Sequence, residues 1–413
     1  MNVSVFMREG KSRQEIRLGP ELKRGGEGIV HTLEGMPLAV AKIYRTETPA
    51  QRAQIERRCE KILSMLARPP RVTSTNFEGA RLPLLAWPTH VLEEEDSTFC
   101  GFLMPRVSAE QAVTLNDFLQ QIWIPKNLSE NERCLTSRLV VCRSLAGIVA
   151  DLHAQGHFVV DVKPENLFIF RRSCIPCFLD NDGFSIAGES NTRFTAFAAT
   201  PGYTCPELLS ETTHAATSSG TYDEPQDRFA LAVLLFQLLN QGIHPFQGVL
   251  TEESDLADTT LDSNVVRGWY AYGLISNQNV RPKPGSNHDC LPEETRALFD
   301  RAFDATSPDG RPSAMEWRKH LDDYLRVSKP FVRCKLHPES VLHIHFKGYP
   351  CVECRTSNLP VPAASTAQAS AAPVTAPPAS ARTRRFPGPS RLVVIALLIL
   401  ITLAWYWFFL RGH

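Results

Sequence analysis

The sequence has no net charge to direct it to a polyanion, because 44 Lys and Arg residues balance 44 Asp and Glu residues. We therefore expect no nucleic-acid partner, and any partner must be recognised locally. The chain also lacks an internal repeat with a period of roughly 20–50 residues, which argues against a solenoid or propeller. With 413 residues, of which 43% are hydrophobic, it can bury one large core or two ordinary ones.

A secretory signal is also missing from the start of the sequence. Residues 1–9, MNVSVFMRE, have neither a long apolar run nor a small-residue cleavage site. We expect the bulk of the chain to stay in a reducing cytosol. The 11 cysteines are scattered apart from one late cluster, so most are expected to be buried thiols rather than a disulfide framework.

Long apolar runs are scarce, and one stands out at the end of the chain. Residues 392–410 contain no charge and lie between Arg391 and Arg411. Nineteen helical residues span roughly 29 Å, the thickness of a bilayer core, so we expect a transmembrane helix over 391–411 rather than a buried core helix. Arginines just before the run favour a cytosolic N-terminal side. Residues 358–390 are almost wholly Ala, Pro, Ser and Thr, which predicts a disordered linker.

Hydrophobic patterns divide the rest of the chain into a strand-rich start and a helical remainder. Residues 17–46 read as strands around a glycine-rich turn. Apolar spacing predicts helices over 49–67 and 137–155, a nearly all-apolar buried helix over 227–239, and further helices within 293–327. The short apolar runs at 99–107 and 167–170 predict buried strands.

The stretch 159–168, VVDVKPENLF, carries the strongest chemical signal. Its spacing places Lys163 two residues and Asn166 five residues after Asp161. Phosphoryl transfer needs a carboxylate to accept the proton of the attacking hydroxyl and an amide oxygen to hold a metal ion. This loop predicts both groups, Asp161 for the proton and Asn166 for the metal.

Other motifs occur before and after this loop. Gly25, Gly26, Gly28 and Val30 form a glycine-rich turn whose backbone N–H groups can approach phosphate closely, and Lys42 follows in Val-Ala-Lys. Downstream lie an Asp-Asn-Asp-Gly segment from Asp180 to Gly183, a Thr-Pro-Gly-Tyr-Thr-Cys-Pro-Glu segment over 200–207, the helix-opening Asp227, and Arg311-Pro312-Ser313.

In this order and spacing, residues of about 15–325 resemble a eukaryotic-type protein kinase domain, of the kind also found in bacteria as Ser/Thr kinases. The resemblance implies an α+β fold with a small β-rich N-lobe and a larger helical C-lobe. It also implies ATP and Mg²⁺ as cofactors and Ser/Thr residues of proteins as substrates. By resemblance Lys42 contacts the α- and β-phosphates, Lys163 the γ-phosphate, Thr200 ties the acceptor loop to Asp161, Asp227 anchors the catalytic loop, and Arg311 pairs with Glu207.

Three features depart from the family pattern. Lys23 replaces the first glycine of the phosphate-covering loop. Val159 and Val160 replace the usual His-Arg, so we expect an enzyme that does not depend on a phosphorylated activation loop. The metal-binding carboxylate is expected to be Asp180, because an apolar strand leads directly into it, with Asp182 as the competitor; two carboxylates two residues apart on a loop can also face one ion. These departures leave a second reading open, a catalytically weak pseudokinase acting as a membrane-anchored ATP-binding scaffold.

In the family, a helix glutamate orients the phosphate-contacting lysine. We expect Glu60 in this role, because its distance from Pro70 matches the family's spacing, with Glu56 as the alternative. Either could instead be a solvated surface charge.

A Cys/His cluster follows the kinase-like region. Cys334-x2-His337 and Cys351-x2-Cys354 are two short-spaced pairs that could supply four zinc ligands, and His343 and His345 compete with His337 for the histidine position. We expect residues 330–357 to form a zinc-binding knuckle, as in a group of bacterial kinases with a small cysteine-rich zinc element after the kinase domain. The sequence identifies neither a regulatory protein nor a partner phosphatase.

Overall fold

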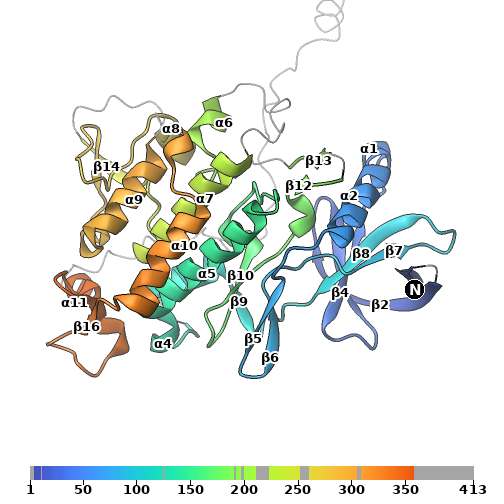
Figure 1. Ribbon diagram of the computed structural model, residues 1–413, viewed down its shortest axis with the longest axis horizontal. Helices are drawn as coiled ribbons and strands as arrows, with labels where there is room; N and C mark the ends of the chain where they lie inside the picture. The colour runs from blue at the N-terminus through green and yellow to red at the C-terminus, as the bar shows by residue number, and fades with distance from the viewer. Residues whose placement is uncertain are drawn as a thin grey trace, which may run out of the picture. The chain divides into compact units, whose positions relative to one another are not determined.

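The computed structural model describes residues 4–10, 12–123, 126–189, 192–196, 200–210, 223–251, 260–304 and 308–357. These residues belong to one compact unit that spans residues 1–360. Within it, a small lobe built on a β-barrel adjoins a larger helical lobe (Figure 1). This is the bilobal α+β arrangement expected from the sequence.

The small lobe is a closed barrel with the strand order β1-β2-β3-β4-β8-β7. Alternate side chains such as Val5, Met7 and Leu103 point inward and fill its interior. The barrel closes because the N-terminal strand pairs with β7 as well as β2, so the lobe starts before residue 15, where we expected the domain to begin. The bounds are β1 Ser4–Glu9, β2 Ser12–Arg24, β3 Gly28–Leu33, β4 Ala39–Tyr44, β7 His90–Glu93 and β8 Phe99–Pro105.

The helical segment expected over 49–67 is two helices, α1 (Pro49–Ala53) and α2 (Ile55–Ala67). Thr48 and Gln51 form a capping box at the start of α1. The buried face of α2 is centred on Ile62 and Met65, whereas Leu63 is exposed. A minor two-stranded sheet, β5 (Ser74–Phe77) and β6 (Ala80–Pro83), follows.

The large lobe is built around two long helices, α5 (Leu135–His153) and α7 (Asp223–Leu239), which confirm the predictions for 137–155 and 227–239. Figure 1 shows α9 and α10 on the same side of this lobe. The remaining helices are α3 Leu115–Trp123, α4 Glu130–Arg133, α6 Pro206–Ser210, α8 Leu261–Val266, α9 Glu293–Phe303 and α10 Ala314–Asp322. The strands are β9 Ala112–Thr114, β10 Leu167–Phe170, β11 Pro176–Phe178, β12 Ile186–Ala187, β13 Arg193–Phe194, β14 Gly248–Leu250 and β15 Val280–Pro282.

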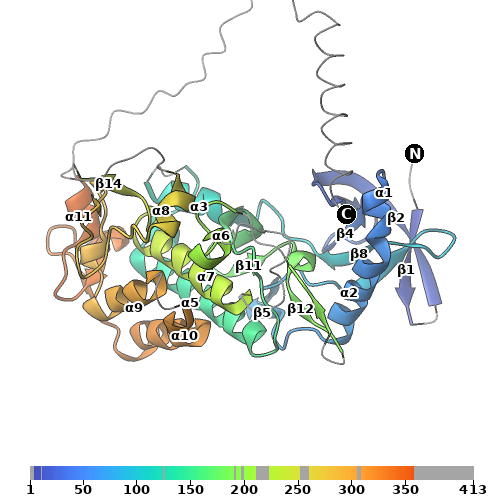
Figure 2. The same cartoon turned by 90° about the horizontal axis from the view of Figure 1, so that it is seen from above.

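The Cys/His region packs on the large lobe as β16 (Phe331–Arg333), β17 (Ile344–Phe346) and α11 (Val352–Ser357), next to α9 in Figure 2. Phe346 is buried, with its ring centroid 5.1 Å from that of Tyr324. The side chain of Arg355 forms an ion pair of 2.5 Å with Asp289. The region therefore shares the core of the large lobe.

No helix in the described ranges is both long and apolar enough to cross a bilayer. The linker and the membrane helix that we expect over 358–390 and 391–411 lie outside those ranges.

Candidate active site

Asp227, in the second turn of α7, fixes the backbone of the catalytic loop. It is fully buried and accepts hydrogen bonds from the backbone N–H groups of Val159 (2.8 Å) and Val160 (2.6 Å). His153, the last residue of α5, lies 2.9 Å from the same carboxylate. The anchoring role expected of Asp227 is confirmed, and it ties the loop to both long helices.

Three side chains meet where an acceptor hydroxyl would enter. The hydroxyl of Thr200 donates to Asp161 Oδ1 at 2.6 Å, and Lys163 Nζ donates to Thr200 Oγ1 at 3.2 Å. Lys163 also forms an ion pair of 2.5 Å with Asp161. The expected contact between Thr200 and Asp161 is therefore present. A carboxylate that can accept a proton, and a lysine that can neutralise phosphate, lie side by side.

Asn166 and Asp180 supply oxygen ligands of the kind that Mg²⁺ prefers. The Asn166 amide donates to the backbone oxygen of Asp161 at 3.3 Å, which leaves its carbonyl oxygen for a metal. Asp180 lies two residues after the end of β11, with φ of 56°, and 54% of its side chain is exposed. Both residues line one cleft of about 570 Å³, together with Asp161 and Asp182. These oxygen ligands fit the Mg²⁺ ion that accompanies a nucleoside triphosphate.

Lys42 on β4 is held by two carboxylates that line this cleft, Asp180 and Asp182. Its Nζ lies 2.6 Å from Asp180 Oδ1 and 2.7 Å and 2.8 Å from the two oxygens of Asp182. Burial alone would lower the pKa of Lys42, but the charges of Asp182 and Asp180 outweigh it and raise that pKa. Lys42 is therefore a fixed cation. A Cβ on Gly101 of β8 would overlap the Lys42 carbonyl oxygen, so glycine allows β8 to lie this close.

Asp182 is the most enclosed of these carboxylates, with only 3% of its side chain exposed. Tyr44, two residues after Lys42 and thus on the same face of β4, donates its hydroxyl to Asp182 at 2.8 Å. Burial would raise the pKa of Asp182, but the charge of Lys42 and the bonds from Lys42 and Tyr44 hold it below its usual range. Asp182 is therefore ionised, and both of its carboxylate oxygens accept hydrogen bonds.

Glu60 does not orient Lys42, contrary to our expectation. Its side chain is exposed, and so is that of Glu56, the alternative. The next residue of α2, Lys61, lines the cleft instead. Successive helical residues point about 100° apart, so a shift of one residue exchanges a carboxylate for a cation. Lys42 obtains its carboxylates from Asp180 and Asp182.

The glycine-rich turn joins β2 and β3 as expected. Gly26 lies in this turn, and the N–H of Gly25 donates to the Gly28 oxygen at 2.9 Å. Val30 pairs across the sheet with Lys42. A Cβ on Gly28 would lie 2.7 Å from the carbonyl oxygen of Ile43, so glycine is required there. The turn is thus fixed against the strand that carries Lys42.

Among the residues of the cleft wall that sequence reasoning missed are Tyr44, Arg57, Arg58 and Lys61. Tyr44 could have been found from its period-two spacing to Lys42. The three cations lie at positions i, i+1 and i+4 of the helix after the lysine strand, which is a recognisable cluster on one side of that helix. Burial lowers the pKa of Lys61 to about 8, although Asp182 partly opposes this effect.

The architectural pair expected between Arg311 and Glu207 is present. The Arg311 guanidinium lies 2.6 Å from Glu207 Oε1, and Arg311 is buried. The pair joins the segment after Thr200 to the start of α10. It therefore positions the acceptor side of the cleft indirectly.

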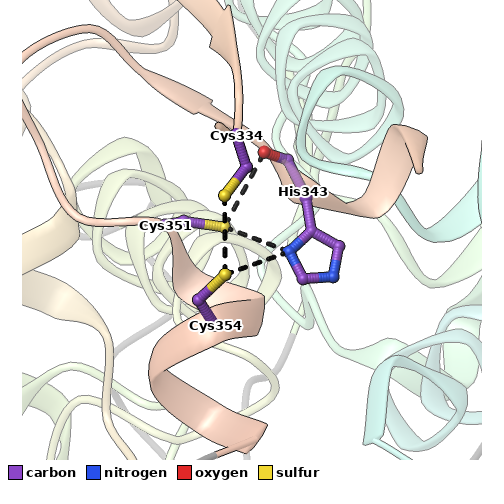
Figure 3. Close-up of side chains that lie close together, drawn as sticks. All are labelled: Cys334, His343, Cys351 and Cys354. Atoms are coloured by element: carbon purple, nitrogen blue, oxygen red, sulfur yellow. Dashed lines mark hydrogen bonds between the residues drawn. The ribbon is translucent and has the colours of Figure 1, made fainter. Parts of the chain in front are cut away.

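A second site lies in the Cys/His region, where four ligand atoms come within 4.8 Å of one another (Figure 3). The sulfur of Cys354 lies 3.5 Å from that of Cys334 and 3.3 Å from His343 Nδ1. Cys351 lies 3.5 Å from the same nitrogen. Tetrahedral zinc with bonds of about 2.3 Å to sulfur holds two sulfurs about 3.8 Å apart, so the group fits this metal.

The histidine of the cluster is His343 rather than His337 or His345, our other candidates. His343 ends a short helical turn immediately before β17 and faces the three cysteines. The His337 ring lies beside it, with the centroids 4.2 Å apart, but His337 is not among the four clustered ligands. The loop path between β16 and β17 decides which histidine reaches the sulfurs.

The model of the protein kinase domain matches residues 94–321, more than half of the chain. The chain belongs to the protein kinase domain family. This match includes Asp161, Asn166 and Asp180, and begins after β7, so Lys42 precedes it. The family implies ATP as the phosphate donor and Mg²⁺ as its metal.

Curated relatives extend the likeness beyond the matched region. The chain is 29% identical over 342 residues to "Protein kinase YegI" of Escherichia coli strain K12, covering 81% of this chain and 48% of that protein. The Escherichia coli O157:H7 counterpart is 28% identical over 310 residues, 74% of this chain and 44% of that protein. The chain thus spans about half the length of these relatives.

A shorter match reaches a eukaryotic kinase. The liver/testis isoform of the phosphorylase b kinase gamma catalytic chain of Mus musculus is 35% identical over 109 residues, 26% of this chain and 25% of that protein. The extended likeness is thus to the bacterial kinases.

Proposed function

We propose that this chain is an ATP-dependent protein kinase that phosphorylates Ser and Thr residues. The contact of Thr200 with Asp161 and Lys163 carries the proposal. A small hydroxyl already occupies the position between the proton acceptor and the phosphate-neutralising lysine. A Ser or Thr hydroxyl of a substrate can be presented to the same pair of side chains.

The residues of the cleft divide the reaction among them. The oxygen of the substrate hydroxyl attacks the γ-phosphorus, and Asp161 accepts the proton of that hydroxyl. The bond between the γ-phosphorus and the β–γ bridging oxygen breaks in the same step. Lys163 and Lys42 neutralise charge on the phosphates, and Asn166 with Asp180 would hold Mg²⁺. Bound Mg²⁺ supplies charge neutralisation on the β- and γ-phosphates.

The test is incorporation of labelled phosphate by the full chain. Asp161→Asn removes the proton acceptor and should lower incorporation by roughly a hundredfold or more, with thermal unfolding unchanged. Asp151→Asn on α5, whose carboxylate contacts Arg318 at the surface, is the matched control. Analysis of the labelled amino acids should show phosphoserine or phosphothreonine.

Unchanged incorporation by Asp161→Asn would refute the assignment. Nucleotide binding with no incorporation by the wild type would favour the scaffold reading instead. A magnesium-dependent thermal shift with ATP separates a functional nucleotide cleft from an inert one.

We also propose that the chain is held at the cytosolic face of a membrane by residues 391–411. The support is the uncharged run 392–410 between two arginines, long enough to cross a bilayer core. The full chain should resist extraction from membranes by alkaline carbonate, and a chain ending at residue 390 should be released. Release of both chains would remove the proposed anchor.

The Cys/His site is proposed to hold one structural Zn²⁺ through Cys334, His343, Cys351 and Cys354. A closed set of three sulfurs and one imidazole nitrogen is typical of structural rather than catalytic zinc. Elemental analysis should give about one zinc per chain. A value near zero in protein purified without chelator would remove the site.

A further inference from the structure

In the cleft, the carboxylate that orients Lys42 does not come from the helix where the kinase family would place it. α2 passes beside the cleft but presents Lys61 to it, and Glu60 is exposed. Asp182 instead comes from the loop after β11, on the large-lobe side. It places both oxygens within 2.8 Å of Lys42 Nζ.

Asp180 and Asp182 are two residues apart but have different surroundings. Lys42 contacts both oxygens of Asp182, and Tyr44 donates to one of them. Asp180 has one contact to Lys42 through Oδ1, and 54% of its side chain is exposed, against 3% for Asp182. A metal ion bound by nucleotide phosphates can reach Asp180, whereas on Asp182 it would have to displace a buried ion pair.

We propose that Asp182 is the positioning residue for Lys42, taking the place of a helix glutamate, and that Asp180 is the carboxylate left to face the nucleotide's metal ion. This inference rests on the proposed kinase function and assigns the two carboxylates of the Asp-Asn-Asp segment to separate tasks. The lysine and both carboxylates then belong to β4 and one loop, so the Lys42 ion pair does not require α2 to move.

The position of Lys61 fits this arrangement. A second cation facing the cleft from α2 would repel Lys42 unless an anion lay between or beside them. Asp182 supplies that anion, since its charge acts on both lysines. No carboxylate lies within ion-pair distance of Lys61 in the part of the chain that the structure describes. The cation is therefore free to meet nucleotide phosphate.

The test compares Asp182→Asn with Asp180→Asn in the full chain. Asp182→Asn should raise the KM for ATP by about tenfold, because Lys42 loses its orientation, while the free Mg²⁺ concentration for half-maximal rate stays unchanged. Asp180→Asn should lower kcat by roughly a hundredfold and shift that Mg²⁺ concentration upward. A residue that only stabilised the fold would not separate these two readouts.

Two further variants sharpen the assignment. Tyr44→Phe keeps every charge and removes one bond to Asp182, so it should raise the KM for ATP by a smaller factor, about two- to threefold. It also replaces Asp182→Asn as the test if that variant does not fold. Glu60→Gln lies outside the cleft and should match the wild type.

The proposal is overturned if Glu60→Gln raises the KM for ATP, or if Asp182→Asn rather than Asp180→Asn shifts the Mg²⁺ dependence. Binding of a fluorescent ATP analogue, measured with and without Mg²⁺, gives the same contrast without turnover. If the wild type incorporates no phosphate, the kinase proposal fails, and the binding measurement still decides between Asp180 and Asp182.

Discussion

Val160 donates its backbone N–H to Asp227 at 2.6 Å while its own φ is 64°, a left-handed conformation that β-branched residues rarely adopt. The Val160 carbonyl accepts a bond from Gln226 at 3.0 Å. Two buried side chains of α7 thus hold the residue before Asp161 in a strained conformation. Strain retained at a functional loop indicates that the direction of Asp161 depends on it.

Substitution of Val160 by Asn should cost less stability than the same change at a buried valine of ordinary conformation, since Asn tolerates the left-handed region. Relief of the strain, about 1 kcal/mol, offsets part of the loss of apolar burial, because Val160 is only 3% exposed. Phosphate incorporation should be retained because the bonds to Asp227 and Gln226 use the backbone. Urea denaturation of Val160→Asn beside Val162→Asn, a neighbour outside the left-handed region, is the measurement. Equal destabilisation by both would contradict the strain.

Removing Arg311 should destabilise the large lobe strongly. Arg311→Ala removes the partner of Glu207 Oε1, and Oε2 is already buried without a hydrogen bond, so the carboxylate is left unpaired; breaking such a pair costs about 3–5 kcal/mol. The double variant Arg311→Met with Glu207→Gln should cost less than Arg311→Ala alone, because no buried charge remains. Denaturation midpoints of the two variants test this order. A larger loss in the double variant would show that the charges themselves are needed.

His244 should make the protein sensitive to mild acid. Burial lowers the pKa of His244 to about 4, and its Nδ1 accepts a bond from the N–H of Phe246. Because this pKa lies below the ordinary value near 6.5, the contribution is fully present above pH 6.5 and is lost as pH falls toward 4. The resulting loss in the free energy of unfolding approaches about 3 kcal/mol.

Urea denaturation between pH 7 and pH 4.5 measures this dependence. The free energy of unfolding of His244→Asn should fall less over that pH interval than that of the wild type. The difference in slope corresponds to at most one proton taken up on unfolding. Its value at pH 7 gives the separate cost of the changed packing. An identical slope in both proteins would mean that His244 is not a source of the acid sensitivity.

Moving the carboxylate onto α2 should repair the loss caused by Asp182→Asn. Lys61 lines the same cleft, so Lys61→Glu in the Asp182→Asn background returns an anion to the neighbourhood of Lys42. We expect the double variant to recover at least part of the ATP affinity. Lys61→Gln in the same background is the matched control, and equal recovery by Gln would attribute the effect to removal of Lys61.

Zinc removal should weaken the large lobe as a whole. The side chains around the Cys/His site share that lobe's core through Phe346 and Tyr324. A strong chelator should therefore lower the unfolding temperature of the full chain by several degrees, and Cys351→Ser should do so without chelator. Cys290→Ser, a buried cysteine outside the cluster, should retain zinc. A chelator effect on Cys351→Ser as large as on wild type would point to a different metal site.

The sequence by itself determined the catalytic loop, its anchor and the long helices. Asp161, Lys163 and Asn166 lie within six residues, so their spacing places them on one loop whatever surrounds it. The helices α5 and α7 can be predicted from the spacing of their apolar residues, which is a local property of the sequence. Asp227, Thr200, Glu207 and Arg311 were found because the order and spacing of separate motifs resemble the kinase family.

Only the tertiary structure decided which groups meet across the cleft and in the metal cluster. Glu60 and Lys61 are adjacent in sequence, and the rotation of α2 against the barrel chooses between them. Asp180 and Asp182 differ through burial, which depends on β4 supplying Lys42 and Tyr44 from 138 or more residues earlier. His343 rather than His337 joins the cysteines because of the loop path to β17. Such choices depend on contacts between distant segments, and local patterns carry no information about them.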